Sequence, residues 1–86
     1  MNKQKKLDTT PRLVDQFNKN AYEVIRTQFI TYNNRQLLDI RTWVLKNGKD
    51  FVPTRKGICL RVDQIDALKE GILKAAERIN KAQRQL

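Results

Sequence analysis

Residues 37–43 read Leu-Leu-Asp-Ile-Arg-Thr-Trp, and after a turn residues 52–60 read Val-Pro-Thr-Arg-Lys-Gly-Ile-Cys-Leu. Apolar and polar residues alternate in the first stretch, which is typical of a β-strand with one buried face. The stretch therefore predicts a sheet with one face for packing a helix and a second face that carries charge and an aromatic ring. The first face would hold Leu38, Ile40, Thr42 and Val44, and the second Leu37, Asp39, Arg41 and Trp43.

Further short strands are predicted on either side of this one. Residues 21–32 are rich in β-branched and aromatic residues, and Asn33-Asn34 offers a turn after them. A second turn is indicated by Asn47-Gly48. A third strand then begins at residue 51, and Pro53 makes it short, bent or an edge strand. Gly57 permits a bulge or corner before a fourth strand over residues 58–60.

From residue 62 onward the apolar period becomes that of a helix, with acidic residues in its first turn and basic residues in its last. About 20 residues would give a helix of roughly 30 Å. Four short strands cannot cover that length, so we expect its far half to pack against a second copy of the chain. The predicted dimer-interface residues are Ile65, Leu68, Ile72, Ala76 and Ile79.

The chain has 86 residues, which predicts a single domain, and a formal net charge of +9. We expect a flexible basic arm over residues 1–16 and one nucleic-acid-binding and dimerisation domain over residues 17–86. From residue 19 to 61 there are nine basic and three acidic residues, against five and four from residue 62 to 86. This excess favours a polyanionic partner. An acidic membrane surface is the competing partner, but the helix has nearly balanced charges on its polar face.

Composition also argues against several classes of function. The chain has no His, the commonest general base and metal ligand, and no nucleophile–base pair stands at a useful spacing. We therefore expect no catalytic residue, no metal site and no cofactor. The single Cys59 fits a reducing compartment, and the basic N-terminus lacks the apolar core of a signal peptide. A cytoplasmic protein is expected, with association with the nucleoid as an alternative.

Leu38-Asp39-Ile40-Arg41, followed by the run from Val52 to Ile58 and an acidic-starting helix, resembles the transcriptional positive cofactor four family over roughly residues 17–80. The resemblance implies an α+β fold in which a four-stranded curved antiparallel sheet precedes one long C-terminal helix (β-β-β-β-α). It also implies a homodimer with paired helices and basic grooves for single-stranded DNA. The short N-terminal region resembles compact, bacterial-type members.

The resemblance matches Arg41, Arg55 and Lys56 to the family's basic contacts, and it sets Tyr32 and Arg35 beside the first turn. Trp43 is left open between a base-stacking ring and a core residue. Asp39 is expected to pair with a neighbouring Arg and orient it. The full set of predicted DNA-binding residues is Arg26, Gln28, Tyr32, Arg35, Arg41, Trp43, Lys46, Lys49, Arg55 and Lys56.

Three functions follow as hypotheses. The leading one is non-enzymatic, largely sequence-independent binding of single-stranded DNA by a homodimer in transcription regulation, replication or repair. The second is an RNA-binding module, because RNA-recognising sheets use the same basic and aromatic chemistry. The third is a dimeric interaction protein that recruits a partner from the transcription machinery.

Overall fold

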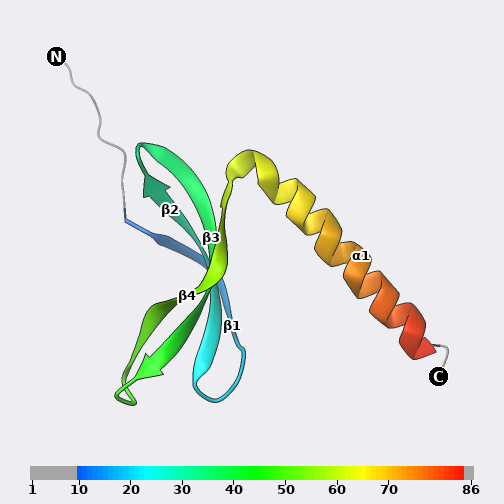
Figure 1. The fold of residues 1–86 in the computed structure, drawn as a ribbon, viewed down its shortest axis with the longest axis horizontal. Coiled ribbons are helices and arrows are strands. Elements are labelled where there is room, and N and C mark those ends of the chain that lie inside the picture. The colour runs from blue at the N-terminus through cyan, green and yellow to red at the C-terminus, as the bar shows by residue number, and fades with distance from the viewer. Residues whose placement is uncertain (1–9, 85–86) are drawn as a thin grey trace.

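The computed structural model describes residues 10–84, and these form one antiparallel sheet followed by one long helix (Figure 1). The four strands lie in the sheet in sequence order: β1 (Arg12–Asn18), β2 (Glu23–Tyr32), β3 (Arg35–Lys46) and β4 (Asp50–Arg61). A 3-10 turn, η1 (Val62–Gln64), leads into helix α1 (Ile65–Arg84). The predicted order of four strands and a C-terminal helix is confirmed.

The strands themselves differ from the prediction in two places. Residues 12–18 form β1, so the flexible arm expected over residues 1–16 is wrong from residue 12, while residues 1–9 lie outside the described chain. Pairing with β2 orders this segment, although its own residues are all exposed. In addition, the two strands expected around Pro53 are one continuous strand, β4. Pro53 fits there because β4 is an edge strand, where a missing N–H is tolerated.

Tight turns join the central strands. Asn33 and Asn34 between β2 and β3 have φ values of 49° and 62°, and Asn47 and Gly48 between β3 and β4 have 56° and 65°. Asn and Gly adopt this left-handed region at the lowest cost, which explains why the chain reverses at these two pairs. Both turns lie where the sequence predicted them.

The register divides the sheet into two faces. Val24, Arg26 and Gln28 of β2 stand opposite Trp43, Arg41 and Asp39 of β3, and this side is called the basic–aromatic face below. The other side is called the apolar face, and the residues that form it are Ile25, Thr27, Phe29, Leu38, Ile40, Thr42, Val44, Val52, Ile58 and Leu60. The alternation predicted for β2 and β3 is therefore present.

Helix α1 meets the sheet only at its beginning. Ile65 and Leu68 are half-buried, and with Leu38 and Ile40 they line an apolar recess of about 300 Å³ between the helix and the apolar face. Beyond this point α1 runs away from the sheet (Figure 1). The radius of gyration is 17.0 Å, against roughly 12 Å for a compact chain of this length. The far half of the helix thus leaves its apolar side chains uncovered in a single chain.

Arg61, at the end of β4, begins the helical region without a capping side chain. Its backbone N–H donates to Gln64 Oε1 at 3.0 Å, and its Nε donates to Asp63 Oδ1 at 3.0 Å. Both members of the Arg61–Asp63 ion pair are exposed. At this helix start, the side chain of Gln64 accepts a hydrogen bond from the backbone of Arg61, and this bond joins the helix to the end of β4. The usual arrangement, in which a Ser, Thr, Asp or Asn side chain caps the helix, is absent at Arg61.

Candidate nucleic-acid interface

Two guanidinium groups stand directly opposite each other on the basic–aromatic face, because Arg26 pairs in register with Arg41. Like charges directly opposite each other destabilise a sheet unless each charge has hydrogen-bonding or oppositely charged partners of its own. Arg41 donates from Nε and Nη2 to the carboxylate of Asp39 at 2.8–3.2 Å, and from Nη1 to the carbonyl of Thr54 at 2.9 Å. The pairing expected for Asp39 is thus confirmed.

The bond with Asp39 is the main reason that the pKa of Arg41 is raised, with the carboxylate's charge acting in the same direction. Asp39 itself is only 4% exposed. A buried carboxylate needs such a partner to remain charged at low cost. Arg41 is therefore committed to holding β3 and β4 together, and only part of its hydrogen-bonding capacity remains for a ligand.

Arg26 is held by a different set of groups. Its Nε donates to Gln16 Oε1 at 2.6 Å, and its guanidinium carbon lies 4.4 Å from the ring centroid of Trp43 and 5.6 Å from that of Phe51. These are cation–π distances. Gln16 was missed by sequence reasoning because it lies in the segment expected to be an arm; the apolar residues Leu13, Val14 and Phe17 around it were the available signal for a strand.

Trp43, for which the sequence left both base stacking and a core position open, packs against Arg26 on the basic–aromatic face. Its ring is half-buried and covered on one side by Arg26, and its indole Nε1 is buried with no hydrogen-bond partner among the described residues. A base could stack on that side of the ring only by displacing Arg26. Gln28 is also half-buried, opposite Asp39.

A bulge in β4 presents Arg55 and Lys56. Arg41 pairs with Gly57 and Trp43 with Pro53, so the three residues 54–56 stand opposite the single residue Thr42. A Cβ on Gly57 would lie 2.5 Å from the carbonyl oxygen of Ile40, so only glycine fits this close approach. Both Arg55 and Lys56 are exposed beside it.

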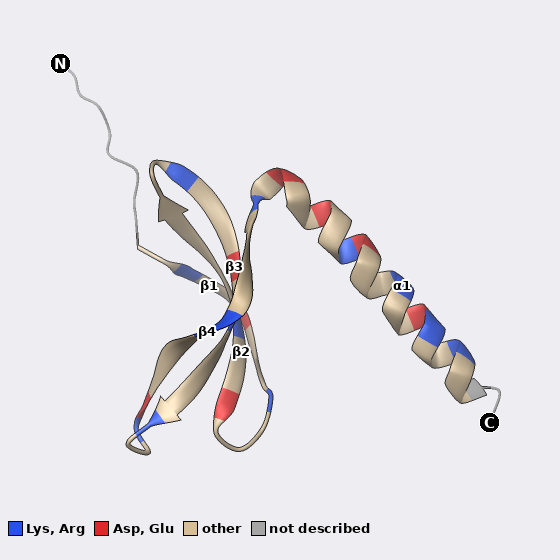
Figure 2. Ribbon diagram, in the orientation of Figure 1, with Lys and Arg blue, Asp and Glu red and all other residues tan. Residues whose placement is uncertain are grey.

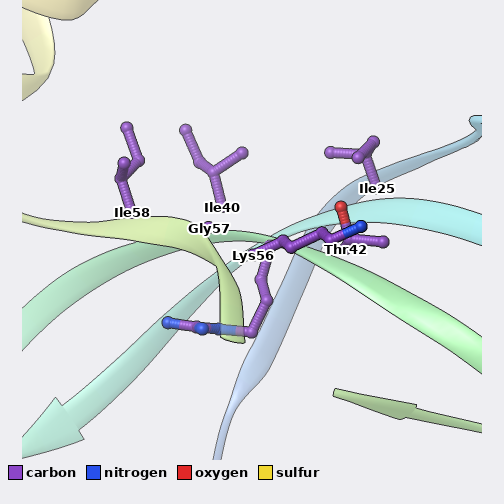
Figure 3. Close-up of a pocket in the computed structure, with 7 residues that line it drawn as sticks. Ile25, Ile40, Thr42, Lys56, Gly57 and Ile58 are labelled. Carbon is purple, nitrogen blue, oxygen red and sulfur yellow. The ribbon is translucent and has the colours of Figure 1, made fainter. Parts of the chain in front are cut away.

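Lys56 does not join the two arginines of the basic–aromatic face. Figure 3 shows its side chain running along the other side of the sheet, toward Thr42 and Ile25, where Ile40 and Ile58 also project. These residues line a shallow hollow of about 330 Å³ with a mostly apolar floor. The charge of Lys56 also contributes to lowering the pKa of Glu23, whose largest cause is the hydrogen bond from Asn20.

The remaining predicted residues lie at the two ends of the sheet. Tyr32, 65% exposed, and Arg35 flank the β2–β3 turn and line a recess of about 400 Å³ with Asn33 and Leu37. Lys46 and Lys49 flank the β3–β4 turn at the opposite end, and both are exposed. Figure 2 shows Lys and Arg at the hairpin ends and across the middle of the sheet, whereas α1 carries both signs of charge.

Five of the predicted cations make no hydrogen bond or ion pair with their side chains in the described part of the chain. These are Arg35, Lys46, Lys49, Arg55 and Lys56. No cluster of three potential metal ligands occurs from residue 10 to 84. Helix α1 is too polar to span a membrane.

Comparison with known proteins gives one consistent result. The family model of Transcriptional Coactivator p15 (PC4) matches residues 19–71, which run from the end of β1 into α1. No curated protein matches the chain. Two crystal forms of a PC4 homologue from Burkholderia pseudomallei K96243 are similar to it. The tetragonal form has a TM-score of 0.74 at 31% identity over 78% of this chain and 98% of that one. The orthorhombic form has 0.73 at 30%, over 83% and 96%.

Proposed function

This chain belongs to the Transcriptional Coactivator p15 (PC4) family, and from that premise we propose that it binds single-stranded DNA as a homodimer, largely independently of sequence and without catalysis. The family resemblance expected from the sequence is confirmed, and membership indicates nucleic-acid binding with a role related to transcription. Single-strand preference, the residues that make contact and the dimer are our proposals.

The observation that supports the proposal most is the set of five cations that make no hydrogen bond or ion pair within residues 10–84. They occur at both ends of β3 and at the bulge between them. An ideal strand of this length spans roughly 36 Å. A flexible strand of nucleic acid that passes around the β4 edge can reach these charges, Lys56 on the apolar face included, releasing counterions as each phosphate is neutralised. Tyr32, exposed beside Arg35, supplies a ring on which any base can stack.

The ten predicted residues then fall into three roles. We assign phosphate contact to Arg35, Lys46, Lys49, Arg55 and Lys56, and base stacking to Tyr32. Arg26, Gln28, Arg41 and Trp43 form the layer that fixes the shape of the sheet and contributes positive potential. The internal bonds and ring contacts of Arg26, Arg41 and Trp43, and the half-buried position of Gln28 opposite Asp39, are the reason for this division.

The dimer is supported by what a single chain leaves exposed. Ile72, Leu73 and Ile79 of α1 are 54–57% exposed, and Val24 and Leu38 are the only apolar side chains classed as buried between residues 10 and 84. Small domains bury a smaller fraction of their surface than large ones, so covering this exposed apolar surface would add to a limited core. We propose that a second copy covers the far half of α1, through Ile72, Ala76 and Ile79, beside Ile65 and Leu68.

Fluorescence anisotropy with a labelled single strand of ~20 nucleotides, over a salt series, tests the proposal. Wild-type protein should prefer the single strand to its duplex. The double variant Arg55→Ala/Lys56→Ala should bind more weakly, and its log–log salt slope should fall by roughly 1.4, since each phosphate contact on a single strand contributes about 0.7. Lys74→Ala/Lys81→Ala removes the same charge from exposed positions of α1 and should leave the slope unchanged.

Other outcomes point to other functions. An RNA strand of the same sequence that competes equally well would favour a general single-strand binder, and a stronger RNA competitor would favour the RNA-binding module. If Arg55→Ala/Lys56→Ala binds as tightly as wild type, the proposed contacts are wrong. Binding to single strand and duplex with equal affinity would leave only nonspecific electrostatic attraction and favour the interaction protein.

A further inference from the structure

We infer that Thr54 is a positioning residue for nucleic-acid binding: its hydroxyl fixes the β4 bulge so that Arg55 and Lys56 are held ready for phosphate. This inference rests on the proposed function and assigns a role to a residue outside the ten predicted contacts. Thr54 itself is half-buried and carries no charge.

The hydroxyl of Thr54 is used in both directions. Oγ1 donates to the carbonyl oxygen of Thr42 at 2.8 Å, across the bulge, and accepts from the backbone N–H of Lys56 at 3.1 Å. A hydroxyl offers one donor and two acceptor positions, so a single atom can make both bonds. Valine has the same shape and can make neither.

These two hydrogen bonds take the place of the regular backbone hydrogen bonds between β3 and β4, which the bulge interrupts. Residues 54–56 stand opposite Thr42 alone, so the extra backbone of β4 lacks regular strand partners. The carbonyl of Thr54 accepts from Arg41, which Asp39 holds in turn. With residue 54 held at its carbonyl and hydroxyl, and residue 56 held at its N–H, the backbone of Arg55 is fixed from both sides.

Fixing the bulge matters because a mobile backbone would lose conformational freedom on binding, and that loss would weaken the affinity. The close approach of Gly57 to Ile40 and Arg41 anchors the next residue against β3. The two cations therefore leave the sheet from a backbone held on both sides, and Lys56 is directed along the apolar face (Figure 3). Removing the hydroxyl keeps both charges but releases the backbone that carries them.

The test compares Thr54→Val, Thr54→Ser and the control Thr27→Val by anisotropy and stopped-flow dissociation on a labelled oligothymidine strand. Thr27 is a half-buried strand residue on the apolar face, and no side-chain hydrogen bond is found for it within residues 10–84. Thr54→Val loses both hydrogen bonds of the hydroxyl and should bind about fivefold more weakly, because part of their net contribution to holding the bulge is felt in the affinity. Dissociation should be faster, while Thr54→Ser and Thr27→Val stay within about twofold of wild type.

A double-mutant cycle separates positioning from general loss of structure. In the Arg55→Ala/Lys56→Ala background, Thr54→Val should cause no further loss of affinity, because the groups it positions are gone. If the fivefold loss persists there, or if Thr54→Val binds like wild type, the inference is overturned. Should Thr54→Val not fold, Thr54→Gly removes the hydroxyl from a bulge that tolerates glycine and should show the same non-additive loss. Wild-type binding that is unaffected by Arg55→Ala/Lys56→Ala would instead overturn the proposed function itself, and the inference with it.

Discussion

In the middle of the sheet, the side chains of Arg26 and Arg41 find their partners within one chain, whereas in the far half of helix α1 the apolar side chains do not. Arg41 and Asp39 form a half-buried ion pair on β3, and Arg26 lies on two aromatic rings. Over α1, by contrast, Ile72 and Ile79 remain more than half exposed. The sheet therefore specifies its own register from within, while the far half of the helix has a pattern that only another surface can satisfy.

The sequence therefore contains residues whose contacts are complete within one chain and residues whose apolar surface stays exposed in one chain. The alternating residues of β2 and β3 encode contacts that close inside the chain, so the structure of one copy accounts for them. The helical apolar stripe encodes a contact that one copy leaves open. Substitutions that remove a contact within the chain should therefore lower the free energy of unfolding. Substitutions at the proposed contact between copies should also lower the mass of the assembly in solution.

The largest effect is expected at the proposed dimer contact of the helix. Ile72→Asp/Ile79→Asp should abolish the dimer, since burying these two side chains is worth about 3–6 kcal/mol. Sedimentation velocity over a range of protein concentrations measures this, with the thermal midpoint recorded in parallel. The control Lys74→Asn/Lys81→Asn changes the net charge equally at exposed positions of α1 and should leave the mass unchanged. A dimer that survives the aspartates would show that the stripe is not the interface.

Within the sheet, Asp39→Asn should cost about 1.5–3 kcal/mol of unfolding free energy, because Arg41 loses its charge-assisted hydrogen bonds. Urea denaturation at fixed protein concentration measures the change. Asp63→Asn breaks the exposed pair with Arg61 and should cost only about 0–1 kcal/mol. Equal losses in the two variants would mean that the network around Arg41 contributes no more than a surface ion pair.

Gly57→Ala should destabilise the protein by about 1–3 kcal/mol through overpacking. The added Cβ would lie 2.5 Å from the carbonyl oxygen of Ile40 and 2.8 Å from Cα of Arg41, so backbone has to move. Because the bulge moves with it, single-strand affinity should fall in the same variant. A variant with unchanged denaturation midpoint and affinity would show that β4 can shift without consequence.

How much of this the sequence could predict depends on how local the determining contacts are. The alternation in β2 and β3, the turns at Asn33-Asn34 and Asn47-Gly48 and the C-terminal helix follow from neighbouring residues and were predicted correctly, although residues 62–64 form a 3-10 turn and α1 itself begins at Ile65. Strand β1 was missed because its order comes from pairing with β2, and β4 was divided because Pro53 is acceptable only at an edge. The candidate contacts were identified from charge, and the pairing of Asp39 with a neighbouring Arg was predicted. The contacts of Arg41 with Thr54, and of Arg26 with Gln16 and Phe51, could not be predicted, because only the strand register brings these residues together.

The smallest effect on stability is expected from a substitution inside helix α1. Gly71 lies inside α1, and a Cβ there would meet no atom within 4 Å in one chain. Gly71→Ala should therefore stabilise the helix by about 0.5–1 kcal/mol, the difference between the two residues in a helix interior. Chemical denaturation and sedimentation together decide the matter. A gain in stability with the dimer intact would show that this side of α1 is open in the assembly as well. A weakened dimer would instead show that the second copy approaches the helix at Gly71, so that this glycine marks close packing between copies just as Gly57 marks it within the sheet.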